Sequence, residues 1–213
     1  ASAQNSMAYT IVSYAGNSEI NFTGTDYKAA IGIQTGGNLK LENSKIHDND
    51  GYGLYADDDG GLINTFANNA FMNNVTGVGL PANEVEDMDE NTAFEGNTSA
   101  DVEISGTTLA ETEEVTWNAL EEGASYRVSG DVDINGVVTI NAGAVFELDE
   151  DVEITVNGAL IANGQDGNLI EFTTSDEASE LLWKGIFVVL ADGRNLLNYV
   201  SLSYAGNTPH NCT

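Results

Sequence analysis

Three copies of one short Asn-bounded phrase constrain the fold of this chain most strongly. The phrase places an apolar residue midway between two Asn residues, and it occupies residues 43–49, 68–74 and 91–97. The copies are therefore almost evenly spaced along this part of the chain. A fixed period of about two dozen residues, with short strand-like runs and polar corners, is typical of a solenoid in which each coil packs on its neighbours.

A second apolar run follows each phrase and keeps the same period. Leu54, Val78 and Val102 represent this run and are evenly spaced. Neighbouring parallel strands lie about 4.8 Å apart, so equivalent inward residues of successive coils should stack into apolar ridges. The predicted ridges are Ile46 on Phe71 on Phe94, and Leu54 on Val78 on Val102.

The Asn residues themselves have a structural explanation that needs no ligand. Asn tolerates the positive φ of a tight corner, and stacked Asn amides can hydrogen-bond from one coil to the next. We predict one ladder at the end of the phrases and a second ladder at their start. The first contains Asn49, Asn74 and Asn97, and the second contains Asn43, Asn68 and Asn91.

Changes in composition and in apolar periodicity divide the chain into three parts. Residues 1–104 are interpreted as a β-helix block that holds the Asn-phrase coils, with an irregular excursion at residues 18–31. Residues 105–125 are acidic and are interpreted as a junction between two blocks. Residues 126–213 alternate apolar and polar residues between Gly, Asn and Asp, which predicts a second β-helix block.

Two details of the second half refine this division. The junction lacks a two-residue period, so it is either a connecting loop or a short helix around Trp117 to Glu121. In the second block, Val132, Val152 and Ile170 follow one another more closely than the Asn phrases do, which predicts coils shorter than those of the first block. Coils of roughly 18–25 residues are therefore expected along the chain, near the short end of known solenoid repeats.

The two ends of the sequence carry nearly the same string. Residues 9–17 and 199–207 agree at six of nine positions, although almost the whole chain separates them. This echo favours a long-period tandem repeat within a larger protein, in which the chain reaches the start of a next repeat. The alternative is a solenoid in which two coils merely share the same local sequence and conformation, without a long-period repeat.

Charge and composition exclude some partners. The chain has 34 acidic and 6 basic residues and a net charge of -28, so no nucleic-acid partner is expected. Such a surface suits salty or extracellular water, or it binds cations. A single Cys builds neither a disulfide framework nor a cysteine metal site. No run of about 18 apolar residues is present, so no membrane insertion is expected.

The densest acidic cluster offers a candidate metal site. Its members are Asp48, Asp50, Asp57, Asp58 and Asp59, at two predicted turns of one coil. Ca²⁺ prefers six to eight oxygen ligands, so carboxylates on adjacent corners are candidate ligands. The same cluster could supply the acid and base of a sugar hydrolase, or it could simply be a solvated acidic turn.

Strand-like strings recur through the second block, at residues 126–134, 140–146, 156–164, 169–175, 183–186 and 197–206. In these strings the second block is similar to right-handed parallel β-helix segments of large bacterial surface and secreted proteins. The Asn phrases resemble coils of the pectate-lyase-like superfamily. The resemblance implies an all-β, right-handed parallel β-helix, but the superfamily includes enzymes, adhesins and inert stalks, so fold does not settle function.

Lyase chemistry on uronates needs basic residues, and this chain offers few. Only Lys40 and Lys45 are close in sequence, and the Gly-His-Gly and Arg-Ile-Lys strings of polygalacturonases are absent. We therefore expect a non-catalytic structural or adhesive module at the cell surface or secreted, which contacts polysaccharide or another surface. Its partners would be neighbouring repeats stacked end to end, with Ca²⁺ as the one candidate cofactor. The alternative is a carbohydrate-active enzyme or its inactive relative.

Overall fold

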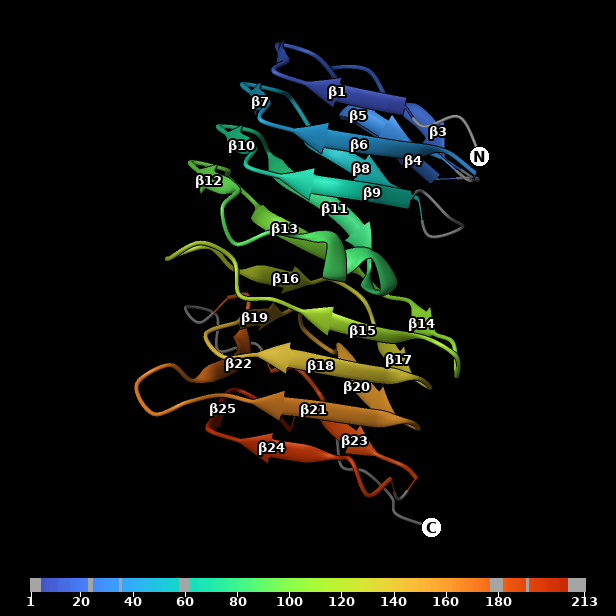
Figure 1. Ribbon diagram of the computed structural model, residues 1–213, viewed down its shortest axis with the longest axis vertical. Coiled ribbons are helices and arrows are strands. Elements are labelled where there is room, and N and C mark those ends of the chain that lie inside the picture. The colour runs from blue at the N-terminus through green and yellow to red at the C-terminus, as the bar shows by residue number, and fades with distance from the viewer. Residues whose placement is uncertain are drawn as a thin grey trace. The chain divides into compact units, whose positions relative to one another are not determined.

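The computed structural model describes residues 5–22, 25–34, 36–57, 62–176, 182–190 and 192–206. These residues form an all-β parallel solenoid of about 6 turns (Figure 1). The predicted fold class is thereby confirmed, while the right-handed sense stays a prediction. The chain divides into two compact units, unit 1 with Ala1–Glu103 and Leu120–Ser125, and unit 2 with Ile104–Ala119 and Tyr126–Thr213.

Unit 1 is built from three parallel sheets, to which each coil contributes one strand in turn. The first sheet contains β1 (Asn5–Ala8), β6 (Asn38–Glu42) and β9 (Leu62–Ala67). The second contains β2 (Ile11–Ser13), β7 (Lys45–His47), β10 (Ala70–Met72) and β12 (Ala93–Glu95). The third contains β5 (Ala29–Ile33), β8 (Tyr52–Ala56), β11 (Thr76–Pro81) and β13 (Ala100–Ser105).

The apolar ridges predicted for unit 1 form where strands stack in register. Phe71 pairs with Ile46 on one side and with Phe94 on the other, and the two Phe rings lie 5.9 Å apart. Leu54 pairs with Val78 in the same way. All five side chains are buried. Full burial of such a side chain contributes about 1.5–3 kcal/mol, so these ridges stabilise the stacking of the coils.

A β-hairpin replaces the irregular excursion expected at residues 18–31. β3 (Ile20–Phe22) and β4 (Thr25–Tyr27) pair antiparallel, outside the parallel sheets. The hairpin explains why the step from Ile11 to its partner Lys45 is longer than the step from Lys45 to Ala70 in the next coil. It is attached through Tyr27, whose ring stacks on that of Tyr55 with a centroid distance of 4.1 Å.

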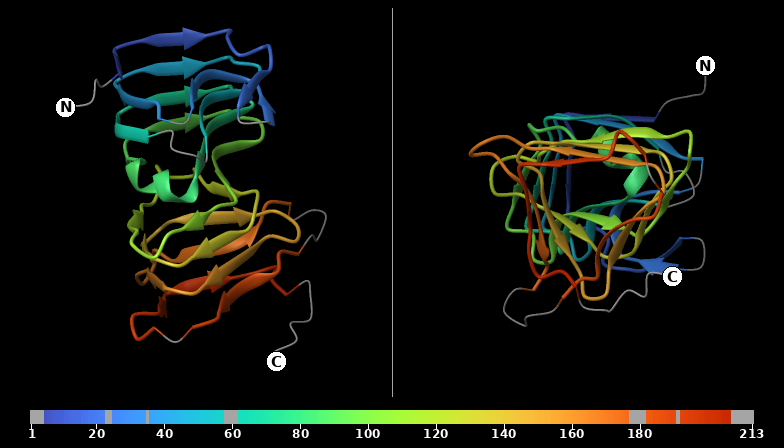
Figure 2. Two further views of the ribbon diagram at one scale, coloured as in Figure 1. Left: turned by 90° about the vertical axis from the view of Figure 1, so that its right-hand side faces the viewer. Right: turned by 90° about the horizontal axis from the view of Figure 1, so that it is seen from below.

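Unit 2 repeats the three-sheet arrangement with its own strands (Figure 2). One sheet contains β14 (Thr108–Leu109), β17 (Val132–Ile134), β20 (Glu153–Val156) and β23 (Gly185–Val188). The next contains β15 (Glu114–Trp117), β18 (Val137–Asn141), β21 (Ala159–Asn163) and β24 (Leu196–Asn198). The remaining strands are β16 (Tyr126–Val128), β19 (Val145–Leu148), β22 (Ile170–Thr174) and β25 (Val200–Leu202).

An aromatic column fills the interior of unit 2. The ring of Phe146 stacks between those of Tyr126 and Phe172, with centroid distances of 5.1 and 5.0 Å. The Tyr126 hydroxyl donates a hydrogen bond to the Asn118 carbonyl at 2.8 Å, and burial raises the pKa of that hydroxyl. A buried polar tip is thus satisfied without interrupting the apolar column.

The structure differs from two expectations for the second half. Residues 105–125 are divided between the units, because β14 and β15 pair with β17 and β18 in unit 2 whereas Leu120–Ser125 belong to unit 1. No helix forms around Trp117 to Glu121. The coils of unit 2 are not uniformly shorter either. Tyr126 pairs with Phe146 after a short step, but the step from Ile161 to its partner Leu196 is longer than any between the Asn phrases.

Corner residues in the left-handed backbone region bracket several short strands. They occur in pairs five positions apart, with φ between 49° and 56°. Asn and Asp adopt this region more readily than other non-glycine residues, whereas Tyr there is uncommon. The pairs are Tyr9 with Tyr14, Asn43 with Asp48, Asn68 with Asn73, and Tyr199 with Tyr204.

The one helical element in the described part of the chain is η1 (Ala82–Asp87), a short 3₁₀ turn between β11 and β12. It follows Pro81 and carries three acidic residues, Glu84, Glu86 and Asp87. No helix in the described ranges has the length and apolar character needed to cross a membrane.

Candidate functional site

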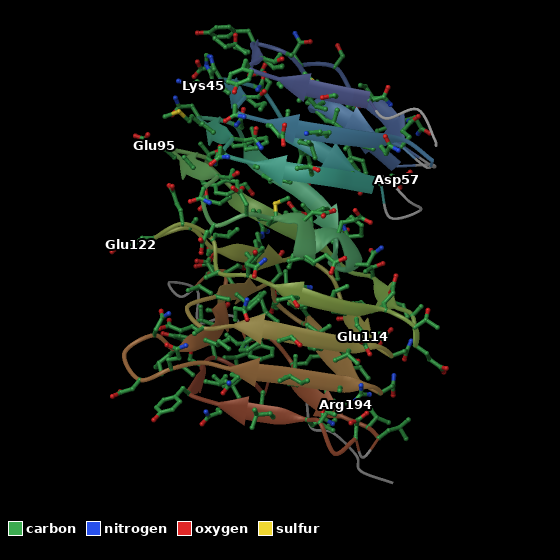
Figure 3. The ribbon with its side chains drawn as sticks, in the orientation of Figure 1. Lys45, Asp57, Glu95, Glu114, Glu122 and Arg194 are labelled. Carbon is green, nitrogen blue, oxygen red and sulfur yellow. The ribbon has the colours of Figure 1, made fainter. Side chains whose placement is uncertain are left out.

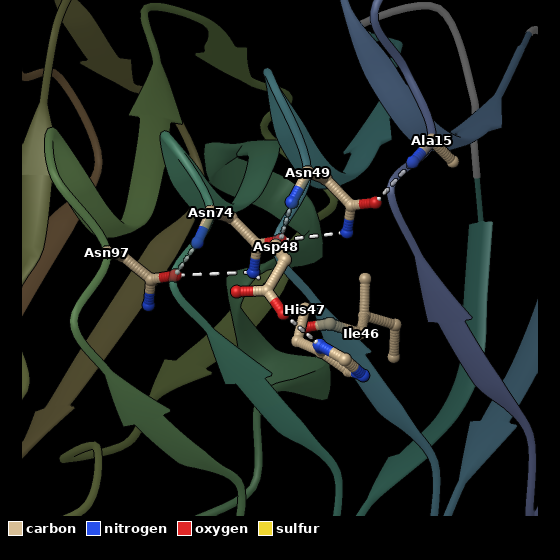
Figure 4. A network of polar contacts seen from close by, with 7 residues as sticks. All are labelled: Ala15, Ile46, His47, Asp48, Asn49, Asn74 and Asn97. Carbon is tan, nitrogen blue, oxygen red and sulfur yellow. Dashed lines mark hydrogen bonds and ion pairs between the residues drawn. The ribbon is translucent and has the colours of Figure 1, made fainter.

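The predicted ladder of Asn49, Asn74 and Asn97 is present and internally satisfied (Figure 4). Asn49 Nδ2 donates to Asn74 Oδ1 at 2.8 Å, and Asn74 Nδ2 donates to Asn97 Oδ1 at 3.2 Å. Asn74 Nδ2 also donates to the Ile46 carbonyl at 3.1 Å. The amides of the first two residues are buried, so they connect coils and are not presented to a ligand.

The second ladder runs one residue later than predicted. Ser44 N donates to Asn69 Oδ1 at 3.1 Å, and Asn69 N donates to Thr92 Oγ1 at 3.2 Å. Asn43 and Asn68 instead occupy the exposed, left-handed corner position just before it. Each corner therefore uses two adjacent residues: the first adopts the left-handed conformation that turns the backbone, and the side-chain oxygen of the second points inward and accepts a hydrogen bond.

Asp48 and Asp50, two of the five predicted metal ligands, lie before β8. His47 Nδ1 and Asp48 Oδ2 form a hydrogen-bonded pair 2.6 Å apart. That hydrogen bond is the main reason why the pKa of Asp48 lies below its usual value. Asp50 is exposed beside this pair.

Asp57 lies at the opposite end of the same strand. β8 has five residues and spans about 17 Å, so it separates Asp57 from the pair Asp48 and Asp50. Asp57 is buried, and its backbone N–H donates to the Ile33 carbonyl at 2.9 Å. Asp58 and Asp59 lie outside the described residues. Within the described ranges, no three His, Cys, Asp or Glu side chains are grouped closely enough to hold a metal ion.

A shallow groove of about 490 Å³ lies along the corner between the first two sheets of unit 1. The Tyr9 and Ile11 side chains that line it are 84% and 71% exposed. Figure 3 shows another lining residue, Lys45, on the side of the unit opposite Asp57. The groove is thus distinct from Asp57 at the end of β8. Its main lining residues are Tyr9, Thr10, Ile11, Asn43, Lys45 and Asn68.

Equivalent corners of three successive coils create this groove. Tyr9 N donates to the Glu42 carbonyl at 3.2 Å, and Asn43 N donates to the Ala67 carbonyl at 2.9 Å. These bonds place Tyr9, Asn43 and Asn68 in one row, each in the left-handed conformation. The sequence reasoning missed the groove, although the position of Tyr9 before a short strand, like that of Asn43, was an available signal.

The lining can recognise polar ligands through several kinds of group. A phenol ring offers an apolar face with a polar tip, two primary amides offer both donors and acceptors, and the ammonium of Lys45 offers donors. Tyr9, Asn43, Asn68 and Lys45 are all exposed. The residues that line the groove include no carboxylate among those that the structure describes, so the lining itself offers amide, ammonium and aromatic groups.

Most of the other basic side chains are committed to ion pairs. Lys40 Nζ lies 2.9 Å from Glu42 Oε2 on β6, whereas Lys45 lies on β7 in a different sheet. The remaining pairs are Arg127 with Asp149, Lys184 with Glu153, and Arg194 with Asp192.

Comparison with known proteins gives no match to a family model, to a curated protein or to a solved structure.

Proposed function

We propose that this chain is a non-catalytic structural and adhesive module of an extracellular tandem-repeat protein, and that it contacts glycans through the groove at Tyr9. The single observation that carries the glycan contact is the exposed Tyr9 ring, 84% accessible, in a row with the amides of Asn43 and Asn68. Sugar rings combine apolar faces with hydroxyl groups, and this pairing of an aromatic face with amides complements both.

The negative charge of the chain favours neutral glycans over anionic ones as ligands. At a net charge of -28, an anionic polysaccharide is repelled on approach, and a neutral one is not. Lys45 supplies a local cation within the groove, although Asp48 lies nearby and lowers the local potential. Neutral oligosaccharides at a cell surface or in the extracellular medium are therefore the proposed ligands.

The scaffold supports the structural half of the proposal. Stacked coils joined by buried polar ladders present one face repeatedly, and the resemblance to right-handed β-helices of bacterial surface proteins and of the pectate-lyase-like superfamily fits such a role. Neighbouring repeats of the same chain, stacked end to end, are the proposed structural partners. The proposed localisation, at the cell surface or in the medium, follows from the same resemblance and from the acidic surface.

A screen of neutral oligosaccharides followed by calorimetry tests the glycan contact. Tyr9→Asn keeps a residue that tolerates positive φ, as Asn43 and Asn68 do at the same position, but it removes the ring. We expect this change to weaken binding at least tenfold. Tyr14→Asn is the matched control, because Tyr14 is also left-handed and 81% exposed but does not line the groove.

Two outcomes would contradict the proposal. Equal binding by the Tyr9→Asn and Tyr14→Asn proteins would show that the groove is not the site. Shortened oligosaccharides, detected by mass spectrometry after incubation with the protein, would instead support the carbohydrate-active enzyme and overturn the non-catalytic assignment.

A further inference from the structure

The segment from β24 to Gly206 reproduces the segment from β1 to Gly16 in backbone conformation as well as in sequence. Tyr199 and Tyr204 have φ of 50° and 56°, and Tyr9 and Tyr14 both have φ of 52°. In each segment the first Tyr separates two short strands, β1 from β2 and β24 from β25. Two left-handed Tyr residues five positions apart are costly and uncommon, so the match extends beyond a shared strand pattern.

Unit 1 shows which strands cover such a segment. β1 pairs with β6, and β2 pairs with β7, both on the side of the following coil. β24 and β25 pair with β21 and β22 of the preceding coil. In the described part of the chain β24 and β25 are the last strands of their sheets, so their other edge corresponds to the edge that β6 and β7 cover in unit 1.

Two apolar columns of unit 2 end at this edge. Leu197 follows Ala162 in one column and Leu202 follows Phe172 in the other, yet each Leu is 48% exposed. When the two Tyr strings are aligned, their counterparts near the start of the chain are Met7 and Val12. In unit 1 these two are covered in register by Leu41 and Ile46, both completely buried.

The backbone at the second Tyr corner is oriented in the same way. Trp183 N donates to the Tyr204 carbonyl at 3.2 Å, and Gly206 N donates to the Trp183 carbonyl at 3.0 Å. Because successive residues of an extended strand direct their backbone groups to alternate sides, the Ala205 N–H faces away from Trp183. Its counterpart, Ala15 N–H, donates to Asn49 Oδ1 of the following coil at 2.9 Å.

We propose that β24 and β25 are the acceptor edge for β6 and β7 of a second copy of this sequence joined in the same chain. Residues 196–206 then replace residues 6–16 of that second copy, with Leu197 opposite its Leu41 and Leu202 opposite its Ile46. This inference rests on the proposed end-to-end stacking of repeats and specifies its register. It also places Tyr199 beside Asn43 and Lys45 of the second copy, which forms a groove equivalent to the Tyr9 groove where the two copies meet.

A tandem chain tests the register directly. Residues 1–206 are followed without a linker by residues 17–213, and hydrogen exchange of the backbone amides of residues 196–202 is compared with that of the single chain. We expect exchange to be at least tenfold slower in the tandem chain, because these strands are then paired on both edges. Binding of two neutral oligosaccharides per tandem chain, against one per single chain, is expected for the rebuilt groove.

Point variants in the first copy identify the contact. Leu202→Lys should return exchange of residues 196–202 in the tandem chain to its single-chain rate, but should change it less than twofold in the single chain. Leu169→Lys is the control, because Leu169 is 40% exposed on a coil that is already followed by another. It should leave the protection of the tandem chain intact.

The possible failures point to different errors. Equal exchange in tandem and single chains, or a tandem chain that aggregates where the single chain does not, would overturn the stacking. Protection that survives Leu202→Lys would overturn the proposed register. Loss of glycan binding alone, with protection intact, would contradict the proposed ligand and leave the stacking supported.

Discussion

Asn74 receives a hydrogen bond from the buried Asn49 side chain at 2.8 Å and returns one to the coil of Asn49, through the Ile46 carbonyl, at 3.1 Å. Its amide also continues to Asn97 in the next coil. One side chain therefore connects three coils of unit 1 while it remains buried. Buried amides are stabilising only when their partners are all present, so this residue is a sensitive point of the scaffold.

Asn74→Ala should lower the free energy of unfolding by about 1–3 kcal/mol, because it leaves the buried groups of Asn49 and Ile46 without a partner. Urea denaturation followed by circular dichroism measures the change. Asn73→Gly is the control, since Asn73 is the exposed neighbour and Gly accepts its φ of 52°. A change within about 0.5 kcal/mol is expected there. Equal effects of both substitutions would argue against the ladder.

Gly158 lies where two coils of unit 2 approach closely. A Cβ atom at this position would lie 2.0 Å from the Gly136 carbonyl oxygen, which already accepts a hydrogen bond from Ala159 N. Gly158→Ala should therefore destabilise unit 2 by about 1–3 kcal/mol through backbone displacement. Gly193→Ala has open space around its Cβ and should change the urea midpoint little. A neutral Gly158→Ala would show that the corner can open without cost.

The carboxyl group of Asp87 should make stability depend on pH. Burial, with added repulsion from Glu84 and Glu86, raises the pKa of Asp87 to about 7. In the unfolded chain the pKa of Asp is about 3.9, so between these values the folded state binds more protons than the unfolded state. This contribution is fully present below pH about 4 and is lost as the pH rises toward 7.

Asp87→Asn removes this titration and keeps the side-chain shape. The difference in urea midpoint between variant and parent should therefore grow as the pH rises from 4 to 7, in favour of the variant. Glu95→Gln, which alters an exposed carboxylate on β12, serves as the control and should show a smaller trend. A constant difference between Asp87→Asn and its parent would contradict the raised pKa.

Calcium binding stays a prediction, and the structure restricts where its test should look. Because β8 separates Asp48 and Asp50 from Asp57, one ion cannot use both groups. If Ca²⁺ binds at Asp57, Ca²⁺ should raise the melting temperature and a chelator should reverse the rise. Asp57→Asn should abolish this response, and Asp50→Asn should leave it unchanged. A melting temperature indifferent to the chelator would exclude this calcium site.

The fold was predictable because its periodic signals are simple. Phe71 and Phe94 are fixed by one repeated phrase, and Asn74 closes its phrase as Asn49 and Asn97 close theirs. The second ladder was displaced by one residue because Asn68 and Asn69 are both polar and adjacent. A sequence does not show which of the two turns the backbone and which one sends its amide inward.

The pairing register of the strands in unit 2 was harder to predict from the sequence. Val152 alternates with polar residues as Val132 does, but Val132 pairs with Ile154, because strands on three faces share the same two-residue pattern. The Tyr9 groove was hidden for a different reason. Tyr rarely adopts a left-handed conformation, so its place before a short strand is a weak sequence signal, and the backbone angles are what establish its equivalence with Asn43.

The left-handed corner at Tyr199 has a consequence for the strength of the proposed glycan contact. A single shallow groove with one exposed ring provides few contacts and therefore a modest affinity. In the proposed tandem array, the corner recurs once in every repeat and presents such grooves along one protein, and each bound sugar raises the effective concentration of the next. Avidity would then grow with the number of repeats, and a cell could adjust its attachment through protein length without changing a binding residue.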